Sequence, residues 1–330
     1  MKKLSFLMIV MLVFAAVFAF TPSRAMADKF KVGMVTDMGG LGDQSFNDMA
    51  WDGLNMLEDE FGSENVEINV IESNNMTEYE PNLRSLADQG YDMVWAVGFL
   101  MTDALAKVAP QYPNTTFGII DAVVEAPNVA SVTFKEHQGS YLVGLIAGMK
   151  TETDTVGFIG GMETPLIKKF EAGYRAGVKE VNPKAEVKIG YTGTWDDPQT
   201  GKELAFTQIN QNADVVYHAA GACGIGVING AKEKDKYAIG VDKPQNHLAP
   251  EHVLTSMVKR VDVAVFKSAK SLYNDDFEPG HIEYGLKDNG VGISDHAAEM
   301  LSDNMLNRVN AYKEQIISGE IEVPAHPDEM

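Results

Sequence analysis

Cysteine is almost absent from this chain of 330 residues, which contains only Cys223. A single cysteine cannot form an internal disulfide bond, so the fold must be stabilised by packing alone. A lipoprotein needs a cysteine directly after its signal peptide, and no cysteine precedes Cys223. We therefore expect no lipid anchor. Cys223 also lacks the histidine and asparagine setting of a catalytic thiol.

Long hydrophobic runs are confined to the N-terminus. Two lysines precede an apolar run from Leu4 to Phe20, and small residues follow at Ala25 and Ala27. This order predicts a signal peptide over residues 1–27. The run is shorter than the ~20 residues that span a membrane, and no later segment approaches that length without charges. We expect an exported, soluble protein of the periplasm.

Basic residues are outnumbered by acidic ones, 27 against 47, which gives a formal charge of −20. The predicted signal peptide contains three of the basic residues and none of the acidic ones, so its removal takes the charge to −23. Nucleic acid and anionic lipid are therefore excluded as partners, and a neutral or cationic ligand is favoured. The seven histidines show no paired spacing such as HExxH, so we expect no metal, no cofactor and no catalytic residue.

Apolar, β-rich runs alternate with amphipathic helical segments along most of the chain. This alternation predicts parallel sheets with helices on both faces, in two Rossmann-like lobes. The length of about 300 mature residues agrees with two domains. The eight expected strands are 30–36, 66–71, 93–97, 116–120, 155–159, 187–191, 215–217 and 237–241.

The last strands and helices expected along the sequence are best explained as segments that return the chain from one lobe to the other. This predicts a hinge of three crossings. We place the crossings near 134–138, 258–260 and 276–290. The first lobe then takes residues 28–135 and 259–278. The second lobe takes residues 136–258 and 279–330.

Ligands of open α/β sheets bind beyond the carboxyl ends of the strands, where loops lead into helices. Polar, glycine and aromatic residues gather at five such ends in the two halves, which indicates a cleft between lobes. The candidates at these ends are Asp37, Gly98, Asp121, His218, Gly221 and Asp242.

Phe46 and Asn47 stand at an expected helix start after the turn that contains Gly39, Gly40 and Asp43. An aromatic ring there suits a flat heteroaromatic ligand, with the amide reading one edge. A core contact within the first lobe is the competing interpretation of Phe46. For the turn residues, the interpretation as a turn and helix cap is favoured.

Asp121 and Asp242 directly follow apolar runs, in FGIID and YAIGVD. Such carboxylates can accept hydrogen bonds from two neighbouring hydroxyls, as adjacent ribose hydroxyls require. Together with Lys259, near the second crossing, they form a possible polar clamp. Strand-end aspartates also cap turns without any ligand, and Lys259 has the alternative role of a hinge salt bridge.

His218 and Trp195 are candidates for a second ring on the other lobe, and Tyr217 is the neighbouring alternative to His218. Each has a structural alternative, since single histidines and tryptophans are usually packed in the fold. The segment from Gly221 to Gly226 lies between a strand and a helix, but it lacks the third glycine of a dinucleotide fingerprint and a Walker lysine. Close backbone approach to a ligand is sufficient to explain it.

Several strings resemble the basic membrane protein family of ABC-transporter substrate-binding proteins, which includes purine-nucleoside receptors. The resemblance covers essentially the whole mature chain. Its most specific strings are TDMGGLGDQSFN from position 36, FGIID at 117–121, SVTFKEHQGSYLVGLIAG at 131–148, VGFIGGMETPLIKKFEAGYRAG at 156–177 and AAGACGIGV at 219–227.

The resemblance implies a type I periplasmic binding protein that is not an enzyme. It would bind a purine nucleoside, as a monomer, and deliver it to an inner-membrane ABC permease that senses hinge closure. Phe46 would stack on the base, and Tyr217 or His218 would supply the second ring. The implied ligand contacts are Asp37, Phe46, Asn47, Asp121, Asp242 and Lys259.

Two alternatives to a nucleoside receptor remain. The same fold would hold riboflavin or another heteroaromatic ligand. From another class of protein, an envelope nucleoside hydrolase would need carboxylates that activate water or a metal. Asp37 and Asp43 are the candidates for that role, although their spacing matches no metal site.

Overall fold

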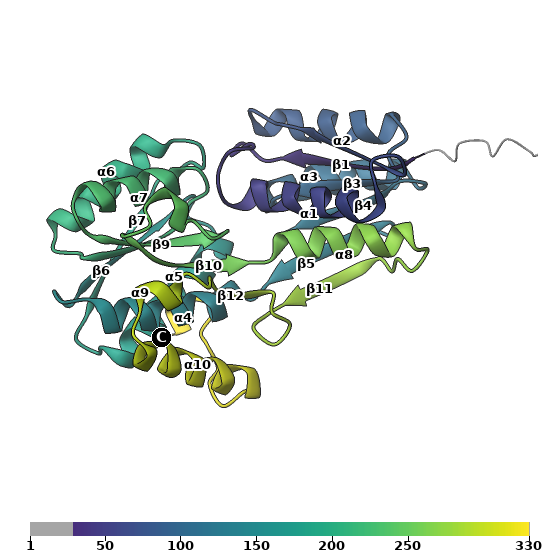
Figure 1. The fold of residues 1–330 in the computed structure, drawn as a ribbon. Coiled ribbons are helices and arrows are strands. Elements are labelled where there is room, and N and C mark those ends of the chain that lie inside the picture. Colours follow the sequence, from purple (N-terminus) through teal and green to yellow (C-terminus); the bar gives the residue numbers. More distant parts are fainter. Residues whose placement is uncertain (1–28, 330) are drawn as a thin grey trace, which may run out of the picture.

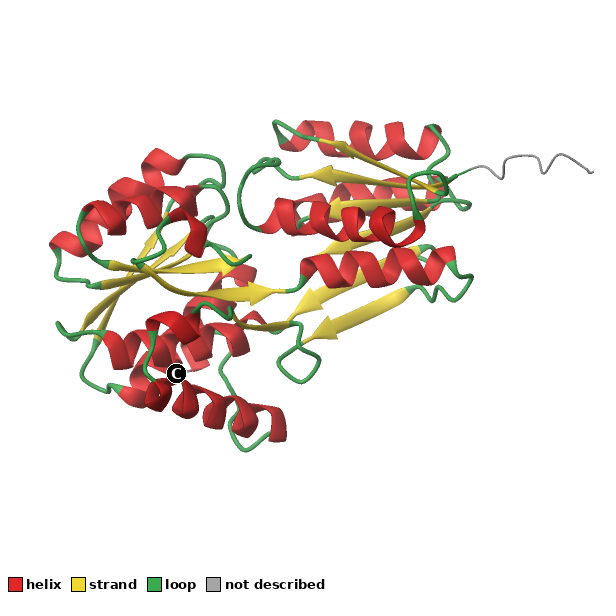
Figure 2. Cartoon of the chain, in the orientation of Figure 1, coloured by secondary structure: helices red, strands yellow, loops and turns green. Residues whose placement is uncertain are grey.

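The computed structural model describes residues 29–329, which form two α/β lobes side by side (Figure 1). The predicted signal peptide lies outside the described residues. Within residues 29–329, no helix has the length and apolar character needed to cross a membrane. Helices cover both faces of each sheet (Figure 2). The prediction of an α/β fold with two Rossmann-like lobes is confirmed.

The sheet of the first lobe has six parallel strands. The residues of its four inner strands are mostly buried, as expected of a parallel sheet covered on both faces. In spatial order the strands are β11 (Gly280–Tyr284), β5 (Val129–Phe134), β4 (Thr116–Ile120), β3 (Met93–Val97), β1 (Phe30–Thr36) and β2 (Val66–Ile71).

Side chains alternate between the two faces of β1 and so belong to two separate cores. Val32 and Met34 pack in the core that includes α1 (Phe46–Phe61) and α8 (Val261–Tyr273). Val35 packs in the core under α2 (Tyr79–Asp88) and α3 (Thr102–Val108). Both cores bring helix starts to the carboxyl ends of the strands.

The sheet of the second lobe also has six strands, of which only β12 is antiparallel to its neighbour. In spatial order they are β12 (Val291–Ile293), β10 (Val253–Lys259), β9 (Tyr237–Asp242), β8 (Val215–Ala219), β6 (Thr155–Gly160) and β7 (Glu186–Tyr191). Its helices are α4 (Glu136–Lys150), α5 (Pro165–Val181), α6 (Pro198–Asn210), α7 (Cys223–Glu233), α9 (Ala297–Met300) and α10 (Asp303–Ser318).

Helices α4 and α5 pack unusually closely because glycines face the neighbouring backbone. A Cβ atom at Gly177 would lie 2.1 Å from the Tyr141 carbonyl oxygen, and one at Gly144 would lie 2.3 Å from the Tyr174 carbonyl oxygen. Real Cβ atoms do not approach oxygen so closely. Gly144, Gly148, Gly173 and Gly177 therefore serve the packing of this helix pair, whereas Gly139 faces Met257 of β10.

The chain crosses between the sheets three times: after β5, after β10 and after β11. These crossings fall within the predicted regions. The assignment of residues 279–330 to the second lobe is wrong for β11, because β11 pairs with β5 in the first sheet. Strands β5, β10, β11 and β12 were not among the eight expected strands, so each sheet is larger than predicted.

Candidate ligand-binding site

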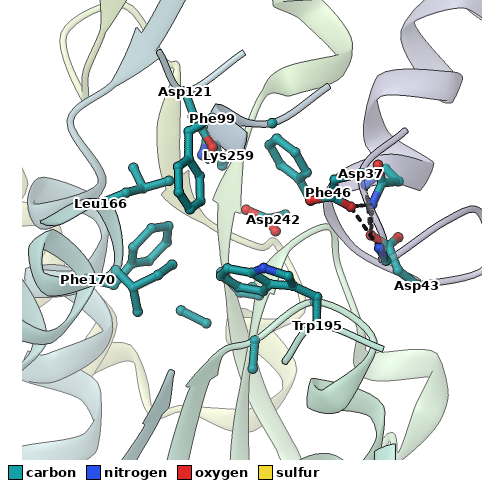
Figure 3. A pocket seen from close by; sticks show the side chains of 18 residues that line it. Asp37, Asp43, Phe46, Phe99, Asp121, Leu166, Phe170, Trp195, Asp242 and Lys259 are labelled. Atoms are coloured by element: carbon teal, nitrogen blue, oxygen red, sulfur yellow. Dashed lines mark hydrogen bonds and ion pairs between the residues drawn. The ribbon is translucent and has the colours of Figure 1, made fainter. Parts of the chain in front are cut away.

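A cavity of about 530 Å³, open solvent at its mouth included, lies between the two lobes. Its walls come from the carboxyl ends of strands β1, β3, β4, β8, β9 and β10, from the starts of α1 and α5, and from the loop before α6 that contains Trp195. Figure 3 shows rings and carboxylates from both lobes facing the same space.

Asp37, Asn47 and Asp43 form a hydrogen-bonded group on the first-lobe wall. The Asn47 amide donates to Asp37 Oδ1 at 2.9 Å and to Asp43 Oδ2 at 3.1 Å. Asp43 also accepts the backbone N–H groups of Ser45 and Asn47, at 2.9 and 2.8 Å, and so fixes the start of α1. Asn47 Oδ1 is buried and accepts no hydrogen bond from the described residues, so it is free to accept one from a ligand.

Gly98 follows β3 and allows this wall to form. Its φ is +119°, and a Cβ atom there would lie 3.2 Å from Asp37 Oδ2 and 3.6 Å from the Phe46 ring. A side chain would therefore be strained and would push into the wall. Gly98 gives the backbone its turn and keeps room for Phe46.

Asp121 and Lys259 form a buried ion pair between the lobes. Lys259 Nζ lies 2.6 Å from Asp121 Oδ2, and the side chains are 1% and 5% exposed. The second carboxylate oxygen, Asp121 Oδ1, is buried and has no hydrogen-bond partner within residues 29–329. Lys259 thus plays the predicted ion-pair role and lines the cavity as well.

Asp242 connects the lobes at a second point. Its Oδ2 accepts a hydrogen bond of 2.7 Å from the hydroxyl of Ser45, which precedes α1. Asp121 and Asp242 both have positive φ, +68° and +60°. Non-glycine residues adopt such angles at a cost of about 1–3 kcal/mol, so the surrounding structure must hold these two residues in place.

Burial raises the pKa of the Asp37, Asp121 and Asp242 carboxyl groups to about 6. Lys259 counteracts this rise at Asp121 and Asp242, because its positive charge favours their ionised forms. The neighbouring carboxylates in turn hold the pKa of Lys259 above its usual range in spite of its burial. The cavity therefore contains three carboxyl groups that accept hydrogen bonds and that burial has made easier to protonate.

Four aromatic rings surround the cavity, two from each lobe (Figure 3). Phe46 begins α1 and Phe99 follows β3 in the first lobe. Phe170 lies on α5 and Trp195 precedes α6 in the second lobe. The rings of Phe99 and Trp195 meet edge to face across the cleft, with centroids 6.5 Å apart. Phe46 thus faces the cavity, as one of its two interpretations required.

The predictions for His218 and Tyr217 are wrong, because neither residue lines the cavity. Both side chains are fully buried in the second lobe. His218 packs over Gly224 and bonds Gln245 at 2.9 Å, and burial lowers its pKa to about 4. Tyr217 bonds Ser140 at 3.1 Å. Trp195, the other candidate, does line the cavity, as does Gly221.

Phe170 and Phe99 line the cavity but were not among the predicted site residues. Phe170 is the last residue of the string TPLIKKF and lies on the buried face of α5. Amphipathic spacing alone marks it as a core residue. Only the position of the second lobe against the first exposes it to a shared cavity.

Comparison with known proteins places the chain in a family. Residues 30–327 match the Bmp family model, described as ABC transporter substrate-binding protein PnrA-like. The chain belongs to this family. It is thus a substrate-binding protein of an ABC transporter rather than an enzyme, and such proteins work outside the cytoplasmic membrane. Within the described residues, no group of three histidine, cysteine or acidic side chains is arranged to hold a metal ion.

Relatives with similar sequences extend over nearly the whole chain. The CD4+ T-cell-stimulating antigen of Listeria monocytogenes is 38% identical, over 90% of this chain and 89% of the relative. The ABC transporter nucleoside-binding protein BmpA of Lactococcus lactis is 36% identical, over 89% of each chain. Basic membrane protein A of Borreliella burgdorferi is 33% identical, over 90% of this chain and 88% of the relative.

Solved structures support the same fold. An ABC transporter solute-binding protein from Aeropyrum pernix superposes with a TM-score of 0.83 at 31% identity, over 91% of this chain and 95% of that one. A solute-binding protein from Conexibacter woesei, at 23% identity and a TM-score of 0.72, covers 89% of this chain and 98% of its own, and shows the fold alone.

Proposed function

We propose that this protein binds a purine nucleoside in the cavity between its lobes and delivers it to the permease of an ABC importer. The observation that carries the proposal is the composition of one cavity: aromatic rings from both lobes lie beside carboxylates with free acceptor atoms. A purine base needs the rings, and its ribose needs the acceptors. The name of the Lactococcus relative, a nucleoside-binding protein, supports the same ligand class.

The base would lie between rings of the two lobes, with Phe46 as the first-lobe ring. Phe46 faces the space that Phe170 and Trp195 border from the second lobe. Stacking of a base on an aromatic ring contributes about 1–3 kcal/mol. Asn47 Oδ1 and the Asp37 carboxylate lie beside Phe46 and offer acceptors to the N–H groups of the base edge.

The ribose would lie at the Asp121, Asp242 and Lys259 end of the cavity. Asp121 Oδ1 is the free acceptor, and Lys259 is an ammonium donor already oriented by Asp121 Oδ2. A sugar hydroxyl both donates and accepts, so it matches a carboxylate and an ammonium placed side by side. Loss of such bonds would leave buried charge without a partner, which is costly.

The proposal is tested by titration calorimetry on the chain from residue 28, unfolded and refolded to remove any bound ligand. Adenosine, guanosine and inosine should bind, and free ribose and uridine should bind much more weakly. Phe46→Ala should weaken nucleoside binding by about 10-fold or more. Phe61→Ala, at the other end of α1 where Phe61 packs on Tyr273, is the matched control and should leave affinity unchanged.

Riboflavin serves as the competing ligand in the same assay. The four rings of the cavity suit riboflavin as well as a purine base. A riboflavin affinity above that of all three nucleosides would therefore assign the cavity to a larger heteroaromatic ligand. Mass spectrometry of ligand released from protein purified without refolding gives an independent identification. A protein that binds none of the nucleosides would refute the proposal.

A further inference from the structure

Glu136 is a buried charge beside the cavity that has no contact with the cavity itself. It is the first residue of α4, directly after the first crossing, and its side chain is 0% exposed. It is absent from the cavity wall. Neither of its carboxylate oxygens has a hydrogen-bond partner among the described residues. A carboxylate in such a position is costly unless neighbouring charges compensate it.

Two lysines of the second lobe provide that compensation. Glu136 Oε1 lies 3.3 Å from Lys259 Nζ, and Oε2 lies 3.5 Å from Lys169 Nζ. Lys169 also donates to the carbonyl oxygen of Phe134, at 3.4 Å, and so holds its end of the arrangement at the first crossing. Of these two partners, Lys259 lines the cavity and Lys169 does not, so Glu136 connects the cavity wall to the first crossing.

Lys259 is confined on several sides. Asp121 Oδ2 lies at 2.6 Å and Glu136 Oε1 at 3.3 Å from its ammonium nitrogen. The centroids of the Phe46 and Phe134 rings each lie 5.1 Å away. An ammonium has three N–H donors. Asp121 Oδ2 accepts one of these donors, and Glu136 attracts the ammonium through its charge without a hydrogen bond. Donors therefore remain for the cavity, which Lys259 lines.

We propose that Glu136 is a positioning residue for ligand binding: from behind the cavity wall it holds the Lys259 ammonium where a ligand hydroxyl can accept from it, while Asp121 Oδ1 stays free. The proposal rests on the proposed function, in which ribose hydroxyls occupy this end of the cavity. Without the Glu136 charge, the ammonium turns further toward Asp121 and Asp242. It then neutralises the two carboxylates that the ribose needs.

The test compares Glu136→Gln with wild type, using inosine and 2′,3′-dideoxyinosine as probes in calorimetry. Dideoxyinosine has the same base but lacks both ring hydroxyls that would meet Asp121 and Lys259. We expect wild type to prefer inosine. In Glu136→Gln the inosine affinity should fall by about 10-fold to 100-fold, while the dideoxyinosine affinity should change little. The ratio of the two affinities should therefore fall toward one.

Glu171→Gln is the matched control, because Glu171 is also a buried glutamate paired with two cations of the second lobe. Its partners Lys168 and Arg175, each at 3.0 Å, lie on its own helix, and Glu171 does not line the cavity. This variant should lose stability in urea unfolding but keep the preference for inosine. A second variant, Glu136→Asp, retains the charge one methylene further from Lys259 and should lose part of the preference.

The outcomes separate the two proposals. If wild type binds neither probe nor any other purine nucleoside, the proposed function fails. If wild type prefers inosine and both Glu136 variants keep that preference, the role of Glu136 is refuted while the proposed function stands. An equal loss of affinity for the two probes would also refute it, because that is the effect of a general structural defect.

Discussion

The hydroxyl of Ser45 donates a 2.7 Å hydrogen bond to the Asp242 carboxylate, and this bond joins the two lobes beside the cavity. Ser45 precedes α1 of the first lobe, and Asp242 ends β9 of the second. Both residues are buried. A buried hydrogen bond to a charged group contributes about 1.5–3 kcal/mol. The arrangement of lobes that shapes the cavity is thus stabilised by a bond next to the site.

Ser45→Ala should weaken inosine binding by about 10-fold, because it removes a bond that holds the lobes in the arrangement that forms the cavity. Calorimetry measures the affinity, and small-angle scattering without ligand should show a larger radius of gyration. Ser268→Ala is the control, since the Ser268 hydroxyl donates to Ala264 within α8. Unchanged affinity together with an unchanged radius would contradict the role of this bond.

Acidification should have opposite effects on ligand binding and on the stability of the unliganded protein. The pKa values of Asp121 and Asp242 are about 6 in the folded protein, raised from 3.8 by burial. A raised carboxyl pKa means that the folded state binds protons more readily than the unfolded state. The contribution of these groups to stability therefore increases as pH falls from about 6 to about 4, and it is lost as pH rises.

Nucleoside affinity should fall over the same pH range, because a protonated carboxyl group accepts fewer hydrogen bonds from ribose hydroxyls. The loss is at most about tenfold per pH unit for each proton taken up. Calorimetry between pH 7.5 and 5 measures the affinity, and urea unfolding measures the stability. Asp121→Asn should reduce the pH dependence of both quantities. Affinity that is constant down to pH 5 would be inconsistent with ionised acceptors.

Nucleoside 5′-monophosphates should bind at least about 100-fold more weakly than nucleosides. The cavity is lined by Asp37, Asp121 and Asp242, and Lys259 is the only cation among its described lining residues. Lys259 is already paired with Asp121. A phosphate with a charge of about −1.5 to −2 would be desolvated among these carboxylates. Competition between inosine and its 5′-monophosphate tests this, and affinities within threefold of each other would argue against it.

Gly177→Ala should lower the free energy of unfolding by about 1–3 kcal/mol, because an added methyl group would overlap the Tyr141 carbonyl between α5 and α4. Urea unfolding measures the loss. Gly292→Ala is the control, since a Cβ atom there meets nothing within 4 Å, and it should change stability by less than about 0.5 kcal/mol. Equal stability of the two variants would show that the helix pair tolerates separation.

Residues at strand ends were found from the sequence because their signal is local. Asp37, Asp121 and Asp242 each follow an apolar run, and parallel strands bring such ends to one edge of a sheet. The placement of His218 at the cavity was wrong for the opposite reason. His218 also ends its strand, but its imidazole turns onto Gly224 in the next helix, and that contact leaves no mark in the spacing.

Strand β11 illustrates the same limit for the fold. Its sequence indicates a strand, but pairing with β5 rather than with the second sheet depends on partners about 150 residues away. Strand β5 itself, VASVTF, is rich in β-branched and aromatic residues, a composition that indicates a strand. That strand could have been recognised, whereas the lobe of β11 could not.

By itself, the sequence determined two α/β units, the acidic character of the chain, and the carboxylates and Phe46 at the edges where ligands of such sheets bind. These properties follow from periodicity and from the chemistry of neighbouring residues. The tertiary structure alone decided that Phe170 and Trp195 face Phe46 across the cavity, and that Glu136 stands behind Lys259. Such pairings depend on how one lobe packs against the other, which no local pattern encodes.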